Sequence, residues 1–200
     1  VLDVIAPGVL IITETNVPHP DNIYYFGNGS NEAHLVYQFA LPPLCAHALI
    51  SGTARYLSEW AAGLTTLSAE TTFFNFSASH DGIGVRPVSD LLPAAEVQRL
   101  VQTCLQHGGQ YSSKTNSDGT TSPYELNINY FDLLNDPTSV EDQAIQVRRF
   151  LVSQAIVLCM AGIPGVYIHS LLGSRNDLAG VQRSGQVRSI NREKLDADAI

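Results

Sequence analysis

The sequence predicts an α/β fold with a parallel sheet, on two observations. Short apolar segments that suit buried strands alternate with longer segments that suit helices, as in right-handed βαβ units. Polar residues follow directly after the apolar segments, where the carboxyl ends of parallel strands meet. The chain is also globular in composition, because 44% of its 200 residues are hydrophobic and 15% are charged.

Four segments are expected to form the strands. Residues 9–12 (VLII) are a short apolar run typical of a buried parallel strand. Residues 34–41 (HLVYQFAL) and 71–76 (TTFFNF) are rich in aromatic and aliphatic side chains, and residues 165–169 (GVYIH) give the fourth strand. Four strands are about half of a (β/α)₈ barrel, which usually needs about 250 residues. A flavodoxin-like open sheet is the alternative.

Helices are expected between these strands. Residues 42–49 begin with two prolines, which are tolerated at a helix start, and residues 55–62 continue as a helix that Gly63 ends. Residues 90–107 and 140–159 have the length and pattern of longer helices.

The remaining segments are less regular. Residues 108–123 are polar and rich in Gly, Ser and Thr, so they predict a loop or small excursion. Residues 125–133 predict a strand or extended segment. From Gly173 onward the chain predicts loops, with a helical piece after Asn191.

Composition excludes several classes of function. With a net charge of −8 and only 11 Lys and Arg residues, the chain has no basic surface for nucleic acid or anionic membranes. No apolar run approaches the roughly 20 residues of a membrane helix. Cys45, Cys104 and Cys159 form no CxxC pair, which indicates buried thiols in a reducing compartment. With no basic segment at the start of the chain, a cytoplasmic protein is expected.

The polar residues after the strands are the candidates for chemistry. Glu14 follows the first strand and is read either as a surface carboxylate or as a general acid whose pKa rises beside apolar strands. His80-Asp81 follows the third strand and is read either as a turn or as part of a site. Two carboxylates at one mouth suit glycoside chemistry. The histidines have no metal-binding spacing, so no metal is expected.

Five segments, in order, resemble the sucrose phosphorylase-like branch of the α-amylase glycoside hydrolase family, which includes the sucrose, glucosylglycerate and glucosylglycerol phosphorylases. The resemblance spans nearly the whole chain. The segments are residues 10–16 (LIITETN), 36–42 (VYQFALP), 73–85 (FFNFSASHDGIGV), 162–167 (GIPGVY) with 171–177 (LLGSRND), and 189–192 (SINR).

The resemblance implies a partial (β/α)₈ TIM barrel that comprises strands five to eight, with a small insertion after strand seven. Residues 1–87 would hold strands five to seven. Residues 88–134 would form the insertion subdomain that helps close the acceptor site. Residues 135–200 would hold helix seven, strand eight and the loop that follows.

The resemblance also implies the chemistry. Retaining enzymes of this kind use two carboxyl groups about 5 Å apart, and phosphate as co-substrate takes the glucosyl group to give α-glucose 1-phosphate without a cofactor. Glu14 would be the general acid/base and Asp81 the transition-state stabiliser. His80 would hydrogen-bond the hydroxyls of an α-glucoside substrate. The other implied substrate-binding residues are Arg86, Asn176, Asp177 and Arg192.

The acceptor-binding segments are closer to the glucosylglycerate and glucosylglycerol phosphorylases than to sucrose phosphorylase. They are residues 31–34 (NEAH) and Arg86-Pro87. Arg86 would then hold an anionic acceptor such as glycerate through a charge-assisted contact, and a surface arginine is the alternative.

The resemblance places the nucleophilic aspartate upstream of Glu14, outside this chain, so we expect the chain alone to be inactive. A half-barrel exposes two sheet edges and an apolar face, so we expect it to pair with the missing N-terminal half of the barrel or as a homodimer. Two other functions stay open at this point: an α-glucoside hydrolase that uses water in place of phosphate, and a non-catalytic half-barrel that acts as a binding or assembly module.

Overall fold

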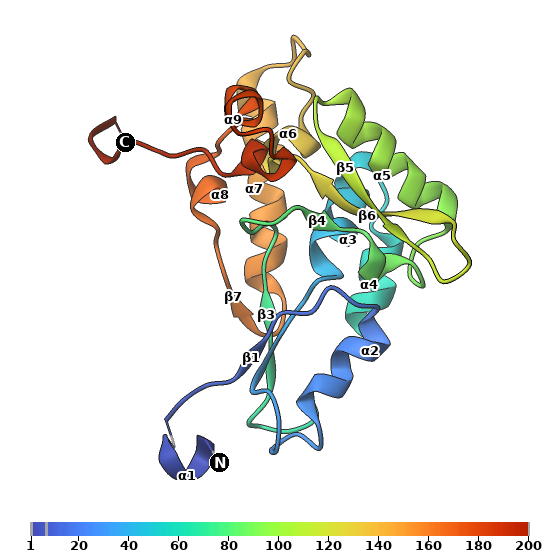
Figure 1. The fold of residues 1–200 in the computed structure, drawn as a ribbon, viewed down its shortest axis with the longest axis vertical. Helices are drawn as coiled ribbons and strands as arrows, with labels where there is room; N and C mark the ends of the chain where they lie inside the picture. Colours follow the sequence, from blue (N-terminus) through green and yellow to red (C-terminus); the bar gives the residue numbers. More distant parts are fainter. Residues whose placement is uncertain (1, 7, 200) are drawn as a thin grey trace.

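A computed structural model describes residues 2–6 and 8–199 and contains a four-stranded parallel sheet (Figure 1). The strands are β1 (Ile12–Thr13), β2 (Leu35–Tyr37), β3 (Thr72–Asn75) and β7 (Ile163–Pro164), and they lie side by side in that order. All three pairings are parallel. The predicted α/β class and parallel sheet are therefore confirmed.

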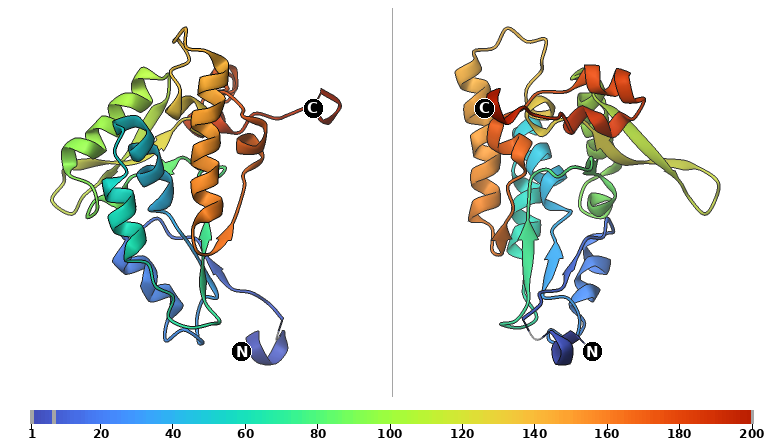
Figure 2. Two further views of the ribbon diagram at one scale, coloured as in Figure 1. Left: turned by 180° about the vertical axis from the view of Figure 1, so that it is seen from behind. Right: turned by 60° about the vertical axis from the view of Figure 1, so that its left-hand side comes forward.

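Helices connect these strands, and α7 runs along one side of them (Figures 1 and 2). Two prolines in the first turn of α3 and Gly63 after α4 delimit the helices as predicted. None of the helices formed by residues 2–6 and 8–199 is both long and apolar enough to cross a membrane. The elements of this part are α1 (Leu2–Ile5), α2 (His19–Ile23), η1 (Tyr24–Phe26), α3 (Leu41–Ser51), α4 (Arg55–Ala62) and α7 (Gln143–Cys159).

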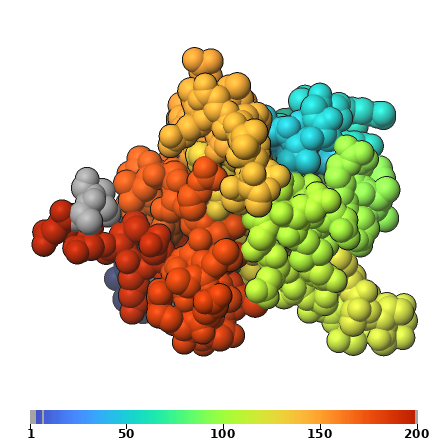
Figure 3. Space-filling model, turned by 90° about the horizontal axis from the view of Figure 1, so that it is seen from above, coloured from blue at the N-terminus to red at the C-terminus, as the bar shows by residue number. Residues whose placement is uncertain are grey.

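A second, antiparallel sheet lies between β3 and α7 in the sequence. Its strands are β4 (Ile83–Gly84), β6 (Thr121–Asn127) and β5 (Gln110–Thr115), in that spatial order, and η2 (Arg86–Val88), α5 (Ala94–Gln106) and α6 (Tyr130–Leu134) belong to the same segment. Strands β5 and β6 form a hairpin that projects from the body (Figures 2 and 3).

The hairpin corrects the expectation of a loop over residues 108–123. Strand β5 (QYSSKT) is mostly exposed and polar, so it carries no apolar alternation that sequence reasoning detects. Gly119, with φ of +81°, supplies the left-handed residue of the turn. The extended segment expected over 125–133 stops at Asn127, because Asn129 caps α6 by accepting a hydrogen bond from the Phe131 amide.

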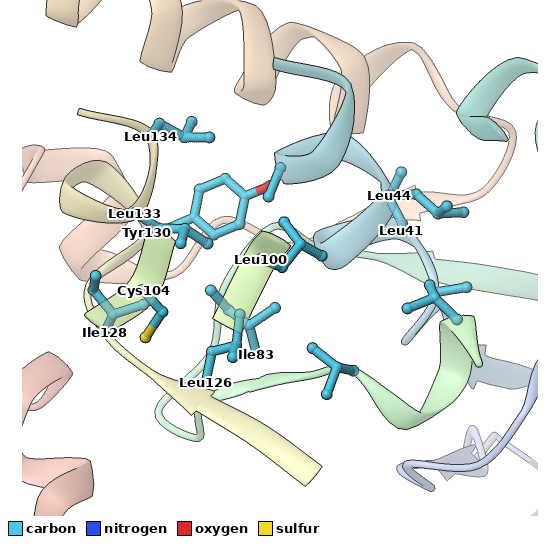
Figure 4. Packing of buried hydrophobic residues seen from close by; sticks show 14 of the residues in the cluster. Leu41, Leu44, Ile83, Leu100, Cys104, Leu126, Ile128, Tyr130, Leu133 and Leu134 are labelled. Carbon is cyan, nitrogen blue, oxygen red and sulfur yellow. The ribbon is translucent and has the colours of Figure 1, made fainter. Parts of the chain in front are cut away.

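The main hydrophobic core packs the second sheet against the helices. Figure 4 shows side chains from α3, α5, β4, β6 and α6 packed together, with the Tyr130 ring among them. The core fixes the second sheet against α3 and thereby positions the loop between β3 and β4. The labelled core residues are Leu41, Leu44, Ile83, Leu100, Cys104, Leu126, Ile128, Tyr130, Leu133 and Leu134.

Replacing Tyr130 with Phe is expected to lower the free energy of unfolding by about 1–2 kcal/mol. The buried hydroxyl donates to the Pro42 carbonyl at 2.9 Å and joins α6 to α3, and the substitution removes this hydrogen bond between the two helices. Urea unfolding of the chain measures the change. The Tyr111→Phe variant, whose side chain is exposed, serves as the control, and equal stability of both variants would contradict the expectation.

The fourth predicted strand, residues 165–169, is wrong. Strand β7 ends at Pro164, and α8 (Ile168–Leu172) places His169 in a helix that Gly173 ends with φ of +62°. Gly165 lies against the Phe74 ring, so the backbone passes too close to β3 for a side chain at that position. Aromatic and β-branched residues favour a strand locally, and tertiary packing overrides that preference.

Other boundaries also shift. Residues Val9 and Leu10 are exposed and precede β1, so the first strand is shorter and later than expected. The second strand ends at Tyr37, and α5 begins only after Pro93. Where loops were expected after Gly173, the chain forms two short elements, α9 (Leu178–Ser184) and η3 (Val187–Asn191). The short helix η4 (Ala197–Ala199) lies after Asn191, where a helical piece was expected.

Candidate functional site

A small cavity lies at the carboxyl ends of the parallel strands. Its volume is about 210 Å³ and aromatic rings form much of its wall. His80 lines it from the loop after β3. The lining residues are Tyr37, Phe74, Phe76, Ala78, Ser79, His80, Gly165, Val166 and Tyr167.

Glu14 directly follows β1 and its side chain is exposed. It acts electrostatically on Tyr37, which lines the cavity from β2: burial raises the pKa of Tyr37, and the negative charge of Glu14 raises it further. The exposed position does not provide the apolar surroundings that were expected to disfavour the charge of Glu14. Glu14 and His80 therefore both lie near the carboxyl ends of the parallel strands.

Two arginines hold Asp81. Its Oδ1 atom accepts from Arg188 Nη1 and from Arg192 Nη2, each at 2.9 Å. The other oxygen, Oδ2, has no hydrogen-bond donor in the part of the chain that the structure describes. Asn191 adds backbone contacts, since its Nδ2 atom donates to the carbonyl of Ser79 at 3.0 Å and to that of Asp81 at 2.9 Å. The segment that ends in Arg192 thus fixes the loop and leaves one Asp81 oxygen open.

Asn176 and Asp177 lie away from this cavity and make structural contacts. The Oδ1 atom of Asn176 accepts from the Asn129 amide at 2.8 Å, and its Nδ2 atom donates to the His107 carbonyl at 3.2 Å. Asp177 caps α9 by accepting from the Gly180 amide at 2.7 Å. The two bonds of Asn176 tie the chain after α8 to the segments that follow α5 and β6.

Arg86 lines a different and larger cavity of about 570 Å³ beside η2 and the hairpin. Lys114 lines the same cavity, and no carboxylate among the described residues pairs with either cation. The predicted site residues therefore fall in three places. Glu14, His80, Asp81 and Arg192 follow the parallel strands or contact the loop after β3, Arg86 lies beside the hairpin, and Asn176 and Asp177 make structural contacts after α8.

Sequence reasoning missed Glu125 and Arg188. Glu125 is only 3% exposed and binds Arg188 through both oxygens, at 2.9 and 2.7 Å. The pKa of Arg188 is raised mainly by its hydrogen bonds to Glu125, and less by the charge of Asp81. The available signal was a glutamate at the start of a predicted strand. If such a strand is buried, its carboxylate requires a cationic partner. Among residues 2–6 and 8–199, no group of three His, Cys, Asp or Glu side chains is arranged to hold a metal ion.

Sequence comparison finds relatives along the whole chain. The glucosylglycerate phosphorylase of Escherichia coli K12 is 50% identical over 200 residues, which are 100% of this chain and 35% of that protein. The glucosylglycerate phosphorylase of Allomeiothermus silvanus is 53% identical over 195 residues, 98% of this chain and 35% of that protein. A sucrose phosphorylase of Agrobacterium vitis is 31% identical over 196 residues, 92% of this chain and 36% of that protein.

Structure comparison finds the same fold in a crystal structure of sucrose 6F-phosphate phosphorylase from Thermoanaerobacter thermosaccharolyticum. The TM-score is 0.80 at 24% sequence identity, over 96% of this chain and 36% of that one. No protein-family model matches the chain. The chain spans about a third of the length of the curated relatives that it matches.

Proposed function

We propose, on the premise that this chain is a homologue of the glucosylglycerate and sucrose phosphorylases, that it supplies part of the catalytic site of a retaining α-glucosyl-transferring phosphorylase. One observation carries the proposal. Glu14, His80 and the partly open Asp81 carboxylate follow the parallel strands β1 and β3, beside a cavity with aromatic walls. Active sites of barrel enzymes are built at this end of the strands.

We assign β1, β2, β3 and β7 to strands five to eight of a (β/α)₈ barrel. Their parallel order along the chain supports the assignment, as does the similarity of the fold to a phosphorylase structure. Residues 88–134 correspond to the insertion after strand seven, and the hairpin with α5 forms most of it.

In this proposal Glu14 gives a proton to the leaving oxygen while a nucleophile from the rest of the enzyme attacks the anomeric carbon. Phosphate then takes the glucosyl group, and Glu14 acts as the base. Asp81 stabilises the positive charge at the anomeric centre through its open Oδ2 atom. His80 hydrogen-bonds glucosyl hydroxyls, and the Phe76 ring supplies apolar wall for the sugar.

Arg192 is proposed to bind phosphate or acceptor, because its guanidinium group contacts Asp81 and the His80 carbonyl and is partly exposed. Substrate contact by Asn176 or Asp177 would require their structural hydrogen bonds to break. We therefore give these two residues a supporting role in holding the loop after α8.

The exposed apolar side chains of α7 and α8 are proposed to be covered by the rest of the barrel or by a second copy of the chain. Leu151 and Leu158 of α7 and Leu171 of α8 are 56%, 56% and 71% exposed. With Val166 they line a cavity of about 370 Å³, and contiguous exposed apolar side chains of this kind mark interaction surfaces.

The proposal is tested in a chimaera in which this chain replaces the matching segment of the E. coli glucosylglycerate phosphorylase. We expect phosphate-dependent release of α-glucose 1-phosphate from glucosylglycerate, glucosylglycerol or sucrose, and no activity of the chain alone. The parent enzyme is the control. Phosphate-independent glucose release would indicate a hydrolase, and a folded chimaera without either activity would contradict the proposal.

Arg86 is expected to select an anionic acceptor. In the synthetic direction, Arg86→Gln in the chimaera should raise KM for D-glycerate about tenfold or more, since a charge-assisted hydrogen bond contributes about 1.5–3 kcal/mol. KM for uncharged glycerol should change little. Arg148→Gln, at an exposed arginine of α7, is the matched control for charge. No change in KM for either acceptor would assign Arg86 to the surface, and equal increases for both would contradict selection by charge.

A further inference from the structure

The contacts that hold Asp81 continue into the insertion and end at a buried carboxylate. Arg188 uses all three guanidinium nitrogens on two carboxylates. Its Nε and Nη2 atoms donate to Glu125 at 2.9 and 2.7 Å, and its Nη1 atom donates to Asp81 Oδ1 at 2.9 Å. The side chain of Glu125 is 4% exposed, while that of Asp81 is 29% exposed. Arg188 thus joins the buried carboxylate of Glu125 to the partly exposed carboxylate of Asp81.

Further contacts fix the Glu125 side of this arrangement. The Glu125 Oε1 atom also accepts from the Gly82 amide at 3.0 Å, so the residue after Asp81 is bound to the same carboxylate. A Cβ atom on Gly82 would lie 2.5 Å from both Glu125 Cγ and the Leu126 carbonyl oxygen. Only glycine allows this close approach, and it sets the loop after β3 directly against β6.

The pairing with Glu125 also limits what Arg188 does to Asp81. Guanidinium groups favour a two-point pair with a carboxylate. Because Glu125 takes that two-point pair, Arg188 has one nitrogen left and reaches only Oδ1 of Asp81. Without the charge of Glu125, Arg188 would be free to turn and pair with both oxygens of Asp81, which would remove the open Oδ2 atom from the site.

We propose that Glu125 is a positioning residue: it holds Arg188 so that Asp81 is fixed through Oδ1 while Oδ2 stays open to the substrate. The consequence is that the insertion takes part in the chemical step without a contact to the reacting atoms. This inference rests on the proposed role of Asp81 as transition-state stabiliser.

The test is Glu125→Gln in the chimaera. Glutamine keeps the size of the side chain and an oxygen for the Gly82 amide but removes the charge. We expect kcat to fall roughly 10- to 100-fold, the size of effect that small misplacements of catalytic groups produce, with KM for glucosylglycerate changed less than threefold. Glu125→Asp, which keeps the charge, should recover part of the loss.

Glu96→Gln is the matched control, because Glu96 lies in the same insertion and pairs with His47 at 2.8 Å, away from Asp81. It should leave kcat unchanged. A folded Glu125→Gln chimaera with kcat within twofold of the unmutated chimaera would overturn the inference. If that variant does not fold, Arg188→Lys decides in the same way, since lysine cannot form the two-point pair.

A crystal structure of the Glu125→Gln chimaera separates this inference from the proposed function. Arg188 should be found on both oxygens of Asp81, even if the chimaera has no phosphorylase activity. Arg188 unmoved, with Oδ2 of Asp81 still open, would overturn the inference. An inactive unmutated chimaera would count against the proposed function alone.

Discussion

Replacing Glu14 with Gln in the chimaera is expected to lower kcat for phosphorolysis of glucosylglycerate by about 10²- to 10⁴-fold, the usual contribution of a general acid. The amide has nearly the shape of the carboxyl group but cannot give a proton to the leaving oxygen. Because Glu14 is exposed after β1, the substitution should not change the unfolding midpoint. Steady-state kinetics at saturating phosphate measure the loss.

The leaving group separates a general acid from a residue that only shapes the site. Fluoride leaves without protonation, so the Glu14→Gln chimaera should lose far less of its rate of glucosyl transfer from α-glucosyl fluoride than from glucosylglycerate. Glu70→Gln, an exposed glutamate before β3, controls for the loss of one charge. Equal losses with both donors would remove Glu14 from the acid role.

Replacing Asp81 with Asn should lower kcat roughly 10²- to 10³-fold, which is the range for loss of one preorganised electrostatic group. Positive charge develops at the anomeric centre whatever the leaving group is. The loss should therefore be similar for glucosylglycerate and α-glucosyl fluoride, in contrast to that of the Glu14 variant. Assays of the Glu14→Gln and Asp81→Asn variants with these two donors thus distinguish proton transfer from charge stabilisation.

The Asp81→Asn variant should still fold, because its amide oxygen can accept from Arg188 and Arg192 as Oδ1 does in the unmutated chain. Circular dichroism and the unfolding midpoint check this point. Asp90→Asn, at an exposed aspartate, is the control for charge. Loss of activity confined to glucosylglycerate would show that Asp81 assists the leaving group and does not stabilise the anomeric centre.

The elements that the sequence predicted well are those whose own residues carry a clear local signal. Helix α4 has the predicted bounds, residues 55–62, because local helix signals and Gly63 determine it. Strands β2 and β3 lie within their predicted segments, since aromatic and β-branched residues there are both strand-forming and buried. The loop positions of Glu14, His80 and Asp81 follow from those strands.

The features that were predicted wrongly or missed depend on solvent exposure or on contacts between residues that are far apart in the chain. Strand β5 of the hairpin is polar and mostly exposed, so it lacks the apolar alternation that identifies a strand. Residues 165–169 carry the composition of a strand, yet contact with Phe74 and the left-handed Gly173 turn them away from the sheet. The partnership of Glu125 with Arg188 joins residues 63 positions apart, and no local pattern encodes such a distance.

The order of the parallel sheet constrains how the chain folds. Strand β7 pairs with β3 through Phe74 and Ile163, and the whole antiparallel sheet lies between them in the sequence. Closing so long a loop costs more conformational entropy than forming a local hairpin does. If the β5–β6 hairpin and α5 form first, they shorten the loop before β7 docks. The insertion would then act as a folding nucleus that brings the last strand of the sheet to its place.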